Sequence, residues 1–202
     1  MVTQAPSNLA TDLSTILADI QRCRLCEESI PEPRPVVRAS DTARLLVIGQ
    51  APGSRVHASG IPWDDASGKR LRHWLNLDAD TFYDESRVAI VPMGFCYPGK
   101  GKSGDLPPRP ECAMTWHQKI LESMPGIRTT LLIGMYAQQF YTNLNHMTLT
   151  QRVLHWRDHA PEQFLLPHPS PRNYLWLKRN PWFEAEVVPE LRSRVETILD
   201  VL

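Results

Sequence analysis

Four cysteines are the residues of this chain whose chemistry is easiest to read. Cys23 and Cys26 form a Cys-x-x-Cys pair, and Cys96 and Cys112 follow with fifteen residues between them in a loop rich in proline and glycine. Four thiolates can hold a zinc ion or an iron–sulfur cluster. A structural zinc site generally uses two close pairs, whereas a cluster takes ligands from loops that are further apart. The spacing favours a cluster, with zinc, or ordinary buried thiols at Cys96 and Cys112, as alternatives.

Two short peptides have the composition of a second site. The first is GQAPG at residues 49–53, which follows an apolar run and precedes Trp63, a flat surface for stacking. The second is HPSPRN at residues 168–173, where two prolines stiffen a loop that presents a histidine, a serine, an arginine and an asparagine. Such a loop suits a site that needs donors held in place. The plainer alternatives are a tight turn at residues 49–53 and a half-buried core aromatic at Trp63.

The elements that must position these peptides alternate between strands and helices. Apolar runs predict strands at 44–48, 88–91, 130–133 and 164–166, and helices are expected at 8–22, 67–76, 109–124, 135–143 and 183–201. Ser67 is a possible N-cap of the helix at 67–76, and the loop at 97–111 has little means of ordering itself. The alternation predicts an α/β fold, a three-layer α/β/α sandwich with a central, mostly parallel four-stranded sheet. Both site peptides directly follow a strand, so we expect them to meet at the carboxyl edge of the sheet, where such folds bind ligands.

Composition sets limits on the class of protein. The 202 residues suit one domain, 1–202, and Lys+Arg and Asp+Glu are equal at 22 each. Net charge therefore gives no support for nucleic-acid binding, although a local basic patch could still meet phosphates. Two basic clusters, Arg70, Arg72 and His73, then Arg172, Lys178 and Arg179, are expected to be solvated faces. The chain lacks a membrane-length apolar run and a signal-peptide pattern, so we expect a cytoplasmic protein with no membrane partner.

The motifs together resemble the uracil-DNA glycosylase superfamily. GQAPG followed by GIPWDDASG is similar to the first motif of family 4, the iron–sulfur type, and HPSPRN is close to the second motif of the single-strand-selective branch. The Cys-x-x-Cys pair and the Cys-x15-Cys pair are similar to the [4Fe–4S] ligand set of family 4. The resemblance covers about residues 20–175, with the motifs in the same order.

The resemblance implies a DNA glycosylase of base excision repair. It would act as a monomer on DNA that contains a damaged base, and hydrolyse the N-glycosidic bond of uracil or another deaminated base to leave an abasic site. A [4Fe–4S] cluster, or alternatively zinc, would be held by Cys23, Cys26, Cys96 and Cys112. No nucleotide cofactor is implied.

The same resemblance assigns roles to the residues of the two peptides. His168 would donate a hydrogen bond to the departing base, and Trp63 would stack on that base. The remaining assignments are the pocket wall and attacking water at Gly49, Gln50, Ala51, Pro52 and Gly53, and DNA contacts at Ser170, Pro171, Arg172 and Asn173. The other histidines, including His117, are expected at the surface.

Two positions depart from the family 4 pattern. Gln50 stands where family 4 has an acid, and an amide cannot act as a general base. Asp64 and Asp65 are the nearest replacements, unless they only cap the following helix. Pro92 stands where family 4 has an asparagine that reads the base. These departures keep open a non-catalytic or differently specific DNA- or modified-base-binding protein of the same fold. A third alternative is an α/β enzyme that acts on free nucleosides, which predicts no affinity for DNA.

Overall fold

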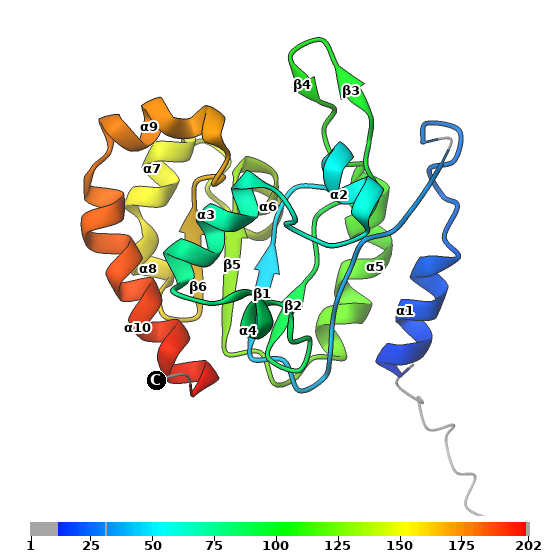
Figure 1. Ribbon diagram of the computed structural model, residues 1–202, viewed down its shortest axis with the longest axis horizontal. Coiled ribbons are helices and arrows are strands. Elements are labelled where there is room, and N and C mark those ends of the chain that lie inside the picture. Colours follow the sequence, from blue (N-terminus) through cyan, green and yellow to red (C-terminus); the bar gives the residue numbers. More distant parts are fainter. Residues whose placement is uncertain (1–11, 31, 201–202) are drawn as a thin grey trace, which may run out of the picture.

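The computed structural model describes residues 12–30 and 32–200, which are built around one parallel sheet (Figure 1). Its four strands lie in the order β2-β1-β5-β6. They are β1 (Leu45–Ile48), β2 (Val88–Ile90), β5 (Thr129–Ile133) and β6 (Gln163–Leu166). Every pairing is parallel. The expected four-stranded α/β sheet is confirmed, with each strand within a residue or so of its expected range.

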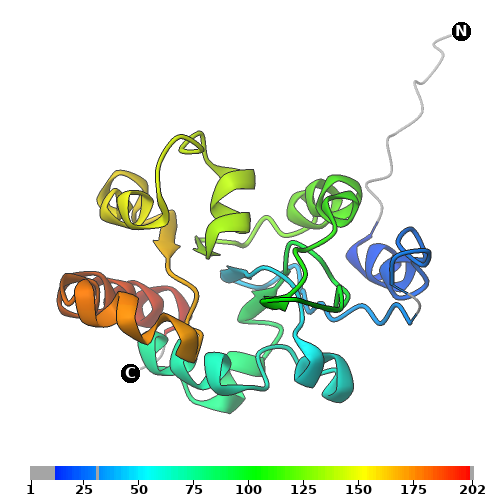
Figure 2. The ribbon, with the colours of Figure 1, turned by 90° about the horizontal axis from the view of Figure 1, so that it is seen from above.

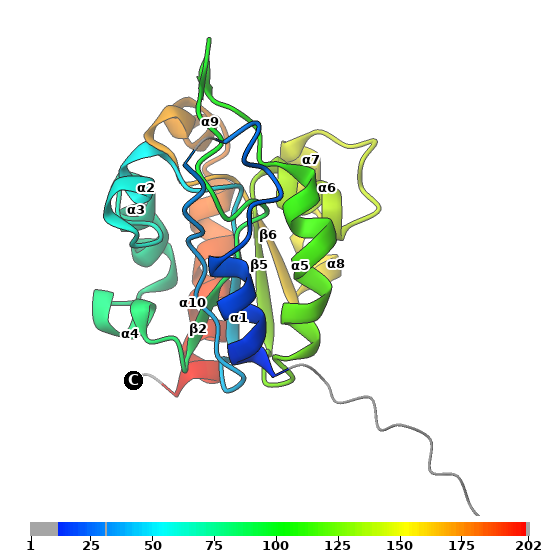
Figure 3. The ribbon, with the colours of Figure 1, turned by 90° about the vertical axis from the view of Figure 1, so that its right-hand side faces the viewer.

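Helices cover both faces of the sheet because its strands are apolar on both sides (Figures 2 and 3). Leu46, Ile48 and Leu132 point to the face covered by α1 (Leu13–Gln21), α5 (Pro110–Glu122) and α6 (Met135–Tyr141). Leu45 and Val47 point to the other face, where α3 (Ala66–Leu75) and α10 (Val188–Leu199) pack. Successive residues of a strand face opposite sides, so a fully apolar strand requires a layer on each. The three-layer sandwich is therefore confirmed.

Shorter elements complete the described chain. They are α2 (Ser54–Ser59), α4 (Ala79–Tyr83), α7 (Leu149–Leu154), α8 (Trp156–His159), α9 (Tyr174–Arg179), the 3-10 turn η1 (Pro171–Asn173) and the π turn η2 (Phe183–Val187). The helix expected at 183–201 thus begins as the π turn and continues as α10. Residues 8–11 of the helix expected at 8–22, and residue 201, lie outside the described residues. None of the described helices is long and apolar enough to cross a membrane.

Two local expectations were wrong. The loop at 97–111 is ordered by an antiparallel hairpin of β3 (Lys100–Gly101) and β4 (Gly104–Asp105), which projects beyond the carboxyl edge of the sheet (Figure 1). Gly99 and Gly104 have φ of 96° and 148°, conformations that glycine adopts without strain. Ser67 does not cap α3, because Asp65 does: its side chain accepts a hydrogen bond from the Gly68 backbone N–H at 2.8 Å.

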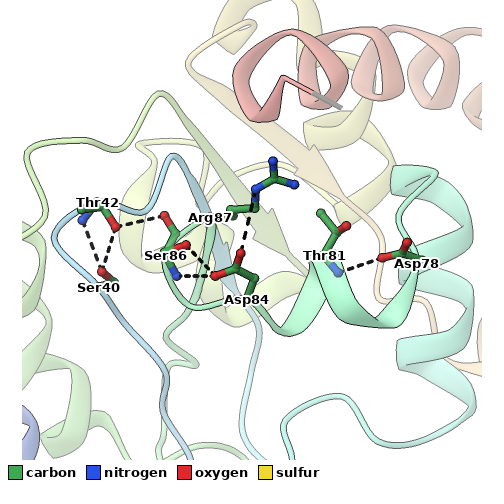
Figure 4. Close-up of polar contacts among 7 residues, drawn as sticks. All are labelled: Ser40, Thr42, Asp78, Thr81, Asp84, Ser86 and Arg87. Carbon is green, nitrogen blue, oxygen red and sulfur yellow. Dashed lines mark hydrogen bonds and ion pairs between the residues drawn. The ribbon is translucent and has the colours of Figure 1, made fainter. Parts of the chain in front are cut away.

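Polar turns fix the opposite, amino-terminal edge of the sheet (Figure 4). Asp84 accepts hydrogen bonds from the Ser86 hydroxyl at 2.5 Å and from the Ser86 N–H at 3.0 Å, just before β2 begins. The Thr42 hydroxyl, just before β1, donates to the Ser86 carbonyl at 3.1 Å. The hydrogen bonds from Ser86 lower the pKa of Asp84. This network aligns the starts of the two strands at the edge opposite the one where the GQAPG and HPSPRN peptides follow β1 and β6.

Candidate functional site

A cavity of about 390 Å³ lies at the carboxyl edge of the sheet. Its lining comes from the ends of β1, β2 and β6, from the start of α3 and from the β3–β4 hairpin. The sequence-predicted residues that line it are Gly49, Gln50, Ala51, Pro52, Gly53, Trp63, Asp65, His168, Ser170, Arg172 and Asn173. Asp64 and Pro171 are not among the lining residues. The two site peptides, more than a hundred residues apart in the chain, thus share one cavity.

His168, which lines this cavity, is held in one orientation. The Ser170 backbone N–H donates to its Nδ1 at 3.2 Å, and the Asn173 side-chain amide donates to its carbonyl at 2.8 Å. Burial lowers the pKa of His168, and the negative charge of Asp65 opposes this shift only in part. The ring is therefore neutral near pH 7. Because Nδ1 is an acceptor, the ring proton sits on Nε2, where it is free to be donated to a ligand.

Trp63 stands against His168 in a strained backbone conformation. Its φ is 57°, in the left-handed region, and its ring centroid lies 5.6 Å from that of His168 at an interplanar angle of 33°. A Cβ at Gly49 would come within 2.8 Å of the indole, and a Cβ at Gly68 within 1.7 Å of the Trp63 carbonyl oxygen. Glycine at both positions thus lets the indole reach the cavity. Trp63 also packs against the core, as the half-buried core aromatic alternative predicts, and its stacking on a base stays a prediction.

The two neighbouring aspartates have different surroundings. Asp65 lines the cavity, and one of its carboxylate oxygens caps α3 while the other accepts no hydrogen bond from the described residues. Asp64 points elsewhere: its carboxylate lies 3.9 Å from Nη2 of Arg55. The helix-capping alternative therefore applies to Asp65 alone. Asp65 is also the carboxylate whose charge acts on His168.

Pro92 and Gln50 form the wall between the ends of β1 and β2. The Gln50 carbonyl accepts a hydrogen bond from the Gly94 N–H at 2.9 Å, so its backbone is tied to the segment after β2. The Pro92 carbonyl lies 3.0 Å from Nε2 of His117. Pro92 therefore offers the cavity neither a polar side chain nor a free carbonyl.

His117 and Arg70 have roles that were not expected. His117 was expected at the surface, but it is buried on α5, where its Nδ1 lies 2.5 Å from the Tyr141 hydroxyl, and burial lowers its pKa to about 4. It is in register with the apolar positions Ala113 and Ile120, and this helical spacing was the signal that could have placed it. Arg70, taken as part of a solvated cluster, donates to the carbonyls of Pro169 and Ser170 at 3.3 and 3.1 Å. It thereby fixes the HPSPRN loop from α3.

The β3–β4 hairpin forms one side of the cavity mouth. Residues 103–105 line the cavity, and the backbone of Gly104 lies so close to Arg172 that a Cβ there would be 2.7 Å from Nη1 of the guanidinium. The Tyr97 hydroxyl donates to the Asp105 carboxylate at 3.3 Å. The loop between Cys96 and Cys112 therefore reaches the HPSPRN loop across the mouth.

All four cysteines line a second, smaller cavity. They are free thiols, and burial raises the pKa of Cys96 to about 11 and that of Cys112 to about 12. The other thiols of the set add to both shifts, which places the four groups within electrostatic reach of one another. In the part of the chain that the structure describes, no three His, Cys, Asp or Glu side chains form a group that could hold a single metal ion.

A comparison with protein-family models identifies the family of this chain. The model of the uracil DNA glycosylase superfamily matches residues 37–192, well over half of the chain. The chain belongs to this superfamily. The matched segment contains both site peptides and the pair Cys96 and Cys112, whereas Cys23 and Cys26 precede it. Uracil DNA glycosylases act on DNA, so the cavity between GQAPG and HPSPRN is the candidate site for a DNA base. The match is to the superfamily as a whole, and the resemblance to family 4 stays a prediction.

Proposed function

We propose that this protein is a DNA glycosylase that hydrolyses the N-glycosidic bond of uracil or another deaminated base. One observation carries the proposal: a neutral imidazole donor, an aromatic face and a carboxylate meet in one cavity at the carboxyl edge of the sheet. These groups belong to His168, Trp63 and Asp65. A base within a duplex cannot reach such a cavity unless it is flipped out of the stack.

His168 and Trp63 would act on the base itself. The flipped base would stack on the indole of Trp63. The Nε2–H of His168 would donate to a base oxygen and stabilise the negative charge that develops there as the glycosidic bond breaks. Donors of this kind are most effective where they are already oriented and shielded from water. The hydrogen bonds from Ser170 and Asn173 orient His168, and its partial burial limits its contact with water.

Asp65 and Gln50 would act on the sugar side of the bond. The Asp65 carboxylate can stabilise the positive charge that develops on the sugar and accept a proton from the attacking water. The Gln50 amide can hold that water but cannot take its proton. We propose that Asp65, not Asp64, takes the part that an acid at position 50 plays in family 4. Its capped position at the start of α3 keeps it in place.

Pro92 bears on which base is accepted. Its side chain makes no hydrogen bonds and its carbonyl faces His117, so the strand end cannot read a base edge as an asparagine would. Stacking on Trp63 and the His168 donor are common to several deaminated bases. We therefore propose that the protein accepts hypoxanthine or xanthine as well as uracil.

The exposed part of the HPSPRN loop would hold the DNA. Pro171 and Arg172 are exposed, whereas His168, Ser170 and Asn173 are partly buried. The loop would press into the minor groove with Ser170, Pro171, Arg172 and Asn173. Arg172, beside the hairpin, would meet a phosphate or the orphan base.

We further propose that Cys23, Cys26, Cys96 and Cys112 hold a [4Fe–4S] cluster, as in family 4. The four thiols share one cavity, and the Nε of Arg109 at that cavity is buried with no acceptor among the described residues, so the donor set fits an anionic group. The zinc alternative needs ligands that converge on a single ion. No three His, Cys, Asp or Glu side chains of the described residues form such a group. When bound, the cluster would link the N-terminal segment to the loop that carries the hairpin.

A cleavage assay tests the glycosylase proposal. Single- and double-stranded oligonucleotides with one uracil, hypoxanthine or xanthine are incubated with the protein, and abasic sites are cut with alkali. We expect cleavage of at least one substrate and its loss in H168A. Binding without product from any substrate would favour the non-catalytic, base-binding alternative. Salt-dependent binding to DNA would count against an enzyme of free nucleosides.

A further inference from the structure

A charged pair stands at the edge of the cavity lined by the four cysteines. Arg109 is the residue just before α5, and its Nη2 lies 2.6 Å from Oε1 of Glu111. Arg109 is the one charged residue among those described as lining this cavity. Four thiolates would bring four negative charges into the cavity, so the guanidinium of Arg109 lies where positive charge is most needed.

Both members of the pair keep a buried polar atom unused. The Nε of Arg109 and the Oε2 of Glu111 are shielded from solvent and have no hydrogen-bond partner among the described residues. Each side chain as a whole is partly exposed, with relative exposures of 40% for Arg109 and 41% for Glu111. A buried donor without an acceptor is costly, and such atoms in native proteins generally mark a missing partner. A thiolate or a cluster sulfide in the adjacent cavity would be an acceptor for the Arg109 Nε–H.

We propose that Arg109 is a positioning residue for the metal group held by the four cysteines, and that Glu111 holds Arg109 in place. The guanidinium donates a hydrogen bond to sulfur and supplies positive charge, while Glu111 moderates that charge. The inference rests on the proposed cluster and is separate from the glycosylase reaction. Hydrogen bonds and charges near the sulfurs are known to set the potential of a cluster, so this pair would tune it as well as retain it.

Substitutions of Arg109 and of Glu111 should shift the reduction potential of the cluster in opposite directions. This distinguishes electrostatic tuning from a general loosening of the structure around the cluster. Loss of the cation in R109Q disfavours the more negative, reduced cluster, so its reduction potential should fall below that of the wild type. Loss of the carboxylate charge in E111Q should raise the potential. R109K keeps the charge and should stay closer to the wild type than R109Q. A merely structural role would shift all variants in one direction or not at all.

The experiment uses anaerobically purified full-length protein. Iron and sulfide content, reduction potential from the visible spectrum, and the rate of iron loss to a chelator are measured for the wild type and the three variants. R157Q serves as a matched control, because Arg157 also forms an exposed pair with a glutamate, Glu186, at 2.9 Å, but does not line the cavity. We expect R109Q to lose iron at least several-fold faster than the wild type and R157Q.

The outcomes distinguish the inference from the proposals beneath it. A wild type without iron overturns both the cluster and the role of Arg109, whatever the cleavage assay shows. An iron-loaded wild type with unchanged potentials and iron loss in R109Q and E111Q overturns the role of Arg109 alone. If R109Q retains no iron, the sign of the shift in E111Q decides: a raised potential supports the inference and an unchanged or lowered one overturns it.

Discussion

Replacement of Asp65 by asparagine separates the two tasks that the structure gives this side chain. Asp65 caps α3 through the Gly68 N–H at 2.8 Å and also places a negative charge in the cavity beside His168. Asparagine is about as good an N-cap as aspartate, so D65N keeps the helix start and removes only the charge. It also leaves His168 neutral, because the Asp65 charge is what raises the pKa of that histidine.

The size of the effect follows from these two tasks. We expect D65N to slow glycosidic cleavage by about 10²–10⁴-fold, the usual contribution of a positioned base. This corresponds to about 3–5 kcal/mol of barrier. The free energy of unfolding should change by less than about 0.5 kcal/mol in D65N, whereas D65A, which loses the cap, should lose about 1 kcal/mol. Neither change in stability is large enough to unfold a detectable fraction of the protein.

The assay is single-turnover cleavage of the best oligonucleotide substrate, with urea unfolding of each variant as the measure of stability. D64N is the matched control, because Asp64 is the neighbouring carboxylate, lies 3.9 Å from Arg55 in an exposed pair and does not line the cavity. Exposed pairs contribute about 0–1 kcal/mol, so D64N should keep both its rate and its stability. A wild-type rate in D65N, or an equal loss in D64N, would refute the assignment to Asp65.

Four further predictions concern His168, the HPSPRN loop, the close contact between Gly68 and Trp63, and His117. H168A should lower the cleavage rate about 10²–10³-fold without loss of DNA binding in a filter-binding assay, and equal rates would remove His168 from the reaction. R70A leaves the carbonyls of Pro169 and Ser170 without their donor, and should lower the free energy of unfolding in urea by about 1–3 kcal/mol and lower the cleavage rate. Wild-type stability in R70A would show that the HPSPRN loop does not depend on Arg70. G68A places a Cβ 1.7 Å from the Trp63 carbonyl and should cost at least about 2 kcal/mol, which thermal melts would show. Burial lowers the pKa of His117 from 6.5 to about 4, so its neutral form contributes stability that is full above pH 6.5 and is lost as the pH falls toward 4, by about 3 kcal/mol in total. Urea unfolding between pH 4 and 7 measures how the free energy of unfolding changes with pH. The same pH dependence in an H117Q variant would contradict the assignment to His117.

Strong local patterns allowed most of the fold to be predicted. The four apolar runs became strands within a residue or so of their expected limits, because a strand buried on both faces leaves little choice of residue type. The hairpin within 97–111 was missed because its strands are two residues each and take their order from glycine turns and tertiary contacts. The N-cap of α3 could not be decided from the sequence, because Ser67 and Asp65 are both good caps and local sequence does not rank them.

The candidate site was predictable as a set of peptides and not as a set of contacts. GQAPG and HPSPRN could be expected at one edge, because the carboxyl ends of parallel strands meet there. The choice between Asp64 and Asp65 depended on the left-handed turn at Trp63, which directs one carboxylate into the cavity and the other toward Arg55. The support of the HPSPRN loop by Arg70 joins residues about a hundred positions apart and has no local pattern.

Residue types and spacing along the chain were enough to define the α/β class, the superfamily resemblance and the set of groups available for chemistry, since these depend on composition and order. The tertiary structure alone decided which groups act together. It made His168 a neutral donor, because the Ser170 N–H occupies Nδ1 and burial disfavours the charged ring. It also put Arg109 and the four cysteines around one cavity. Burial and mutual distance determine protonation and partnership, and neither is a property of a residue in the unfolded chain.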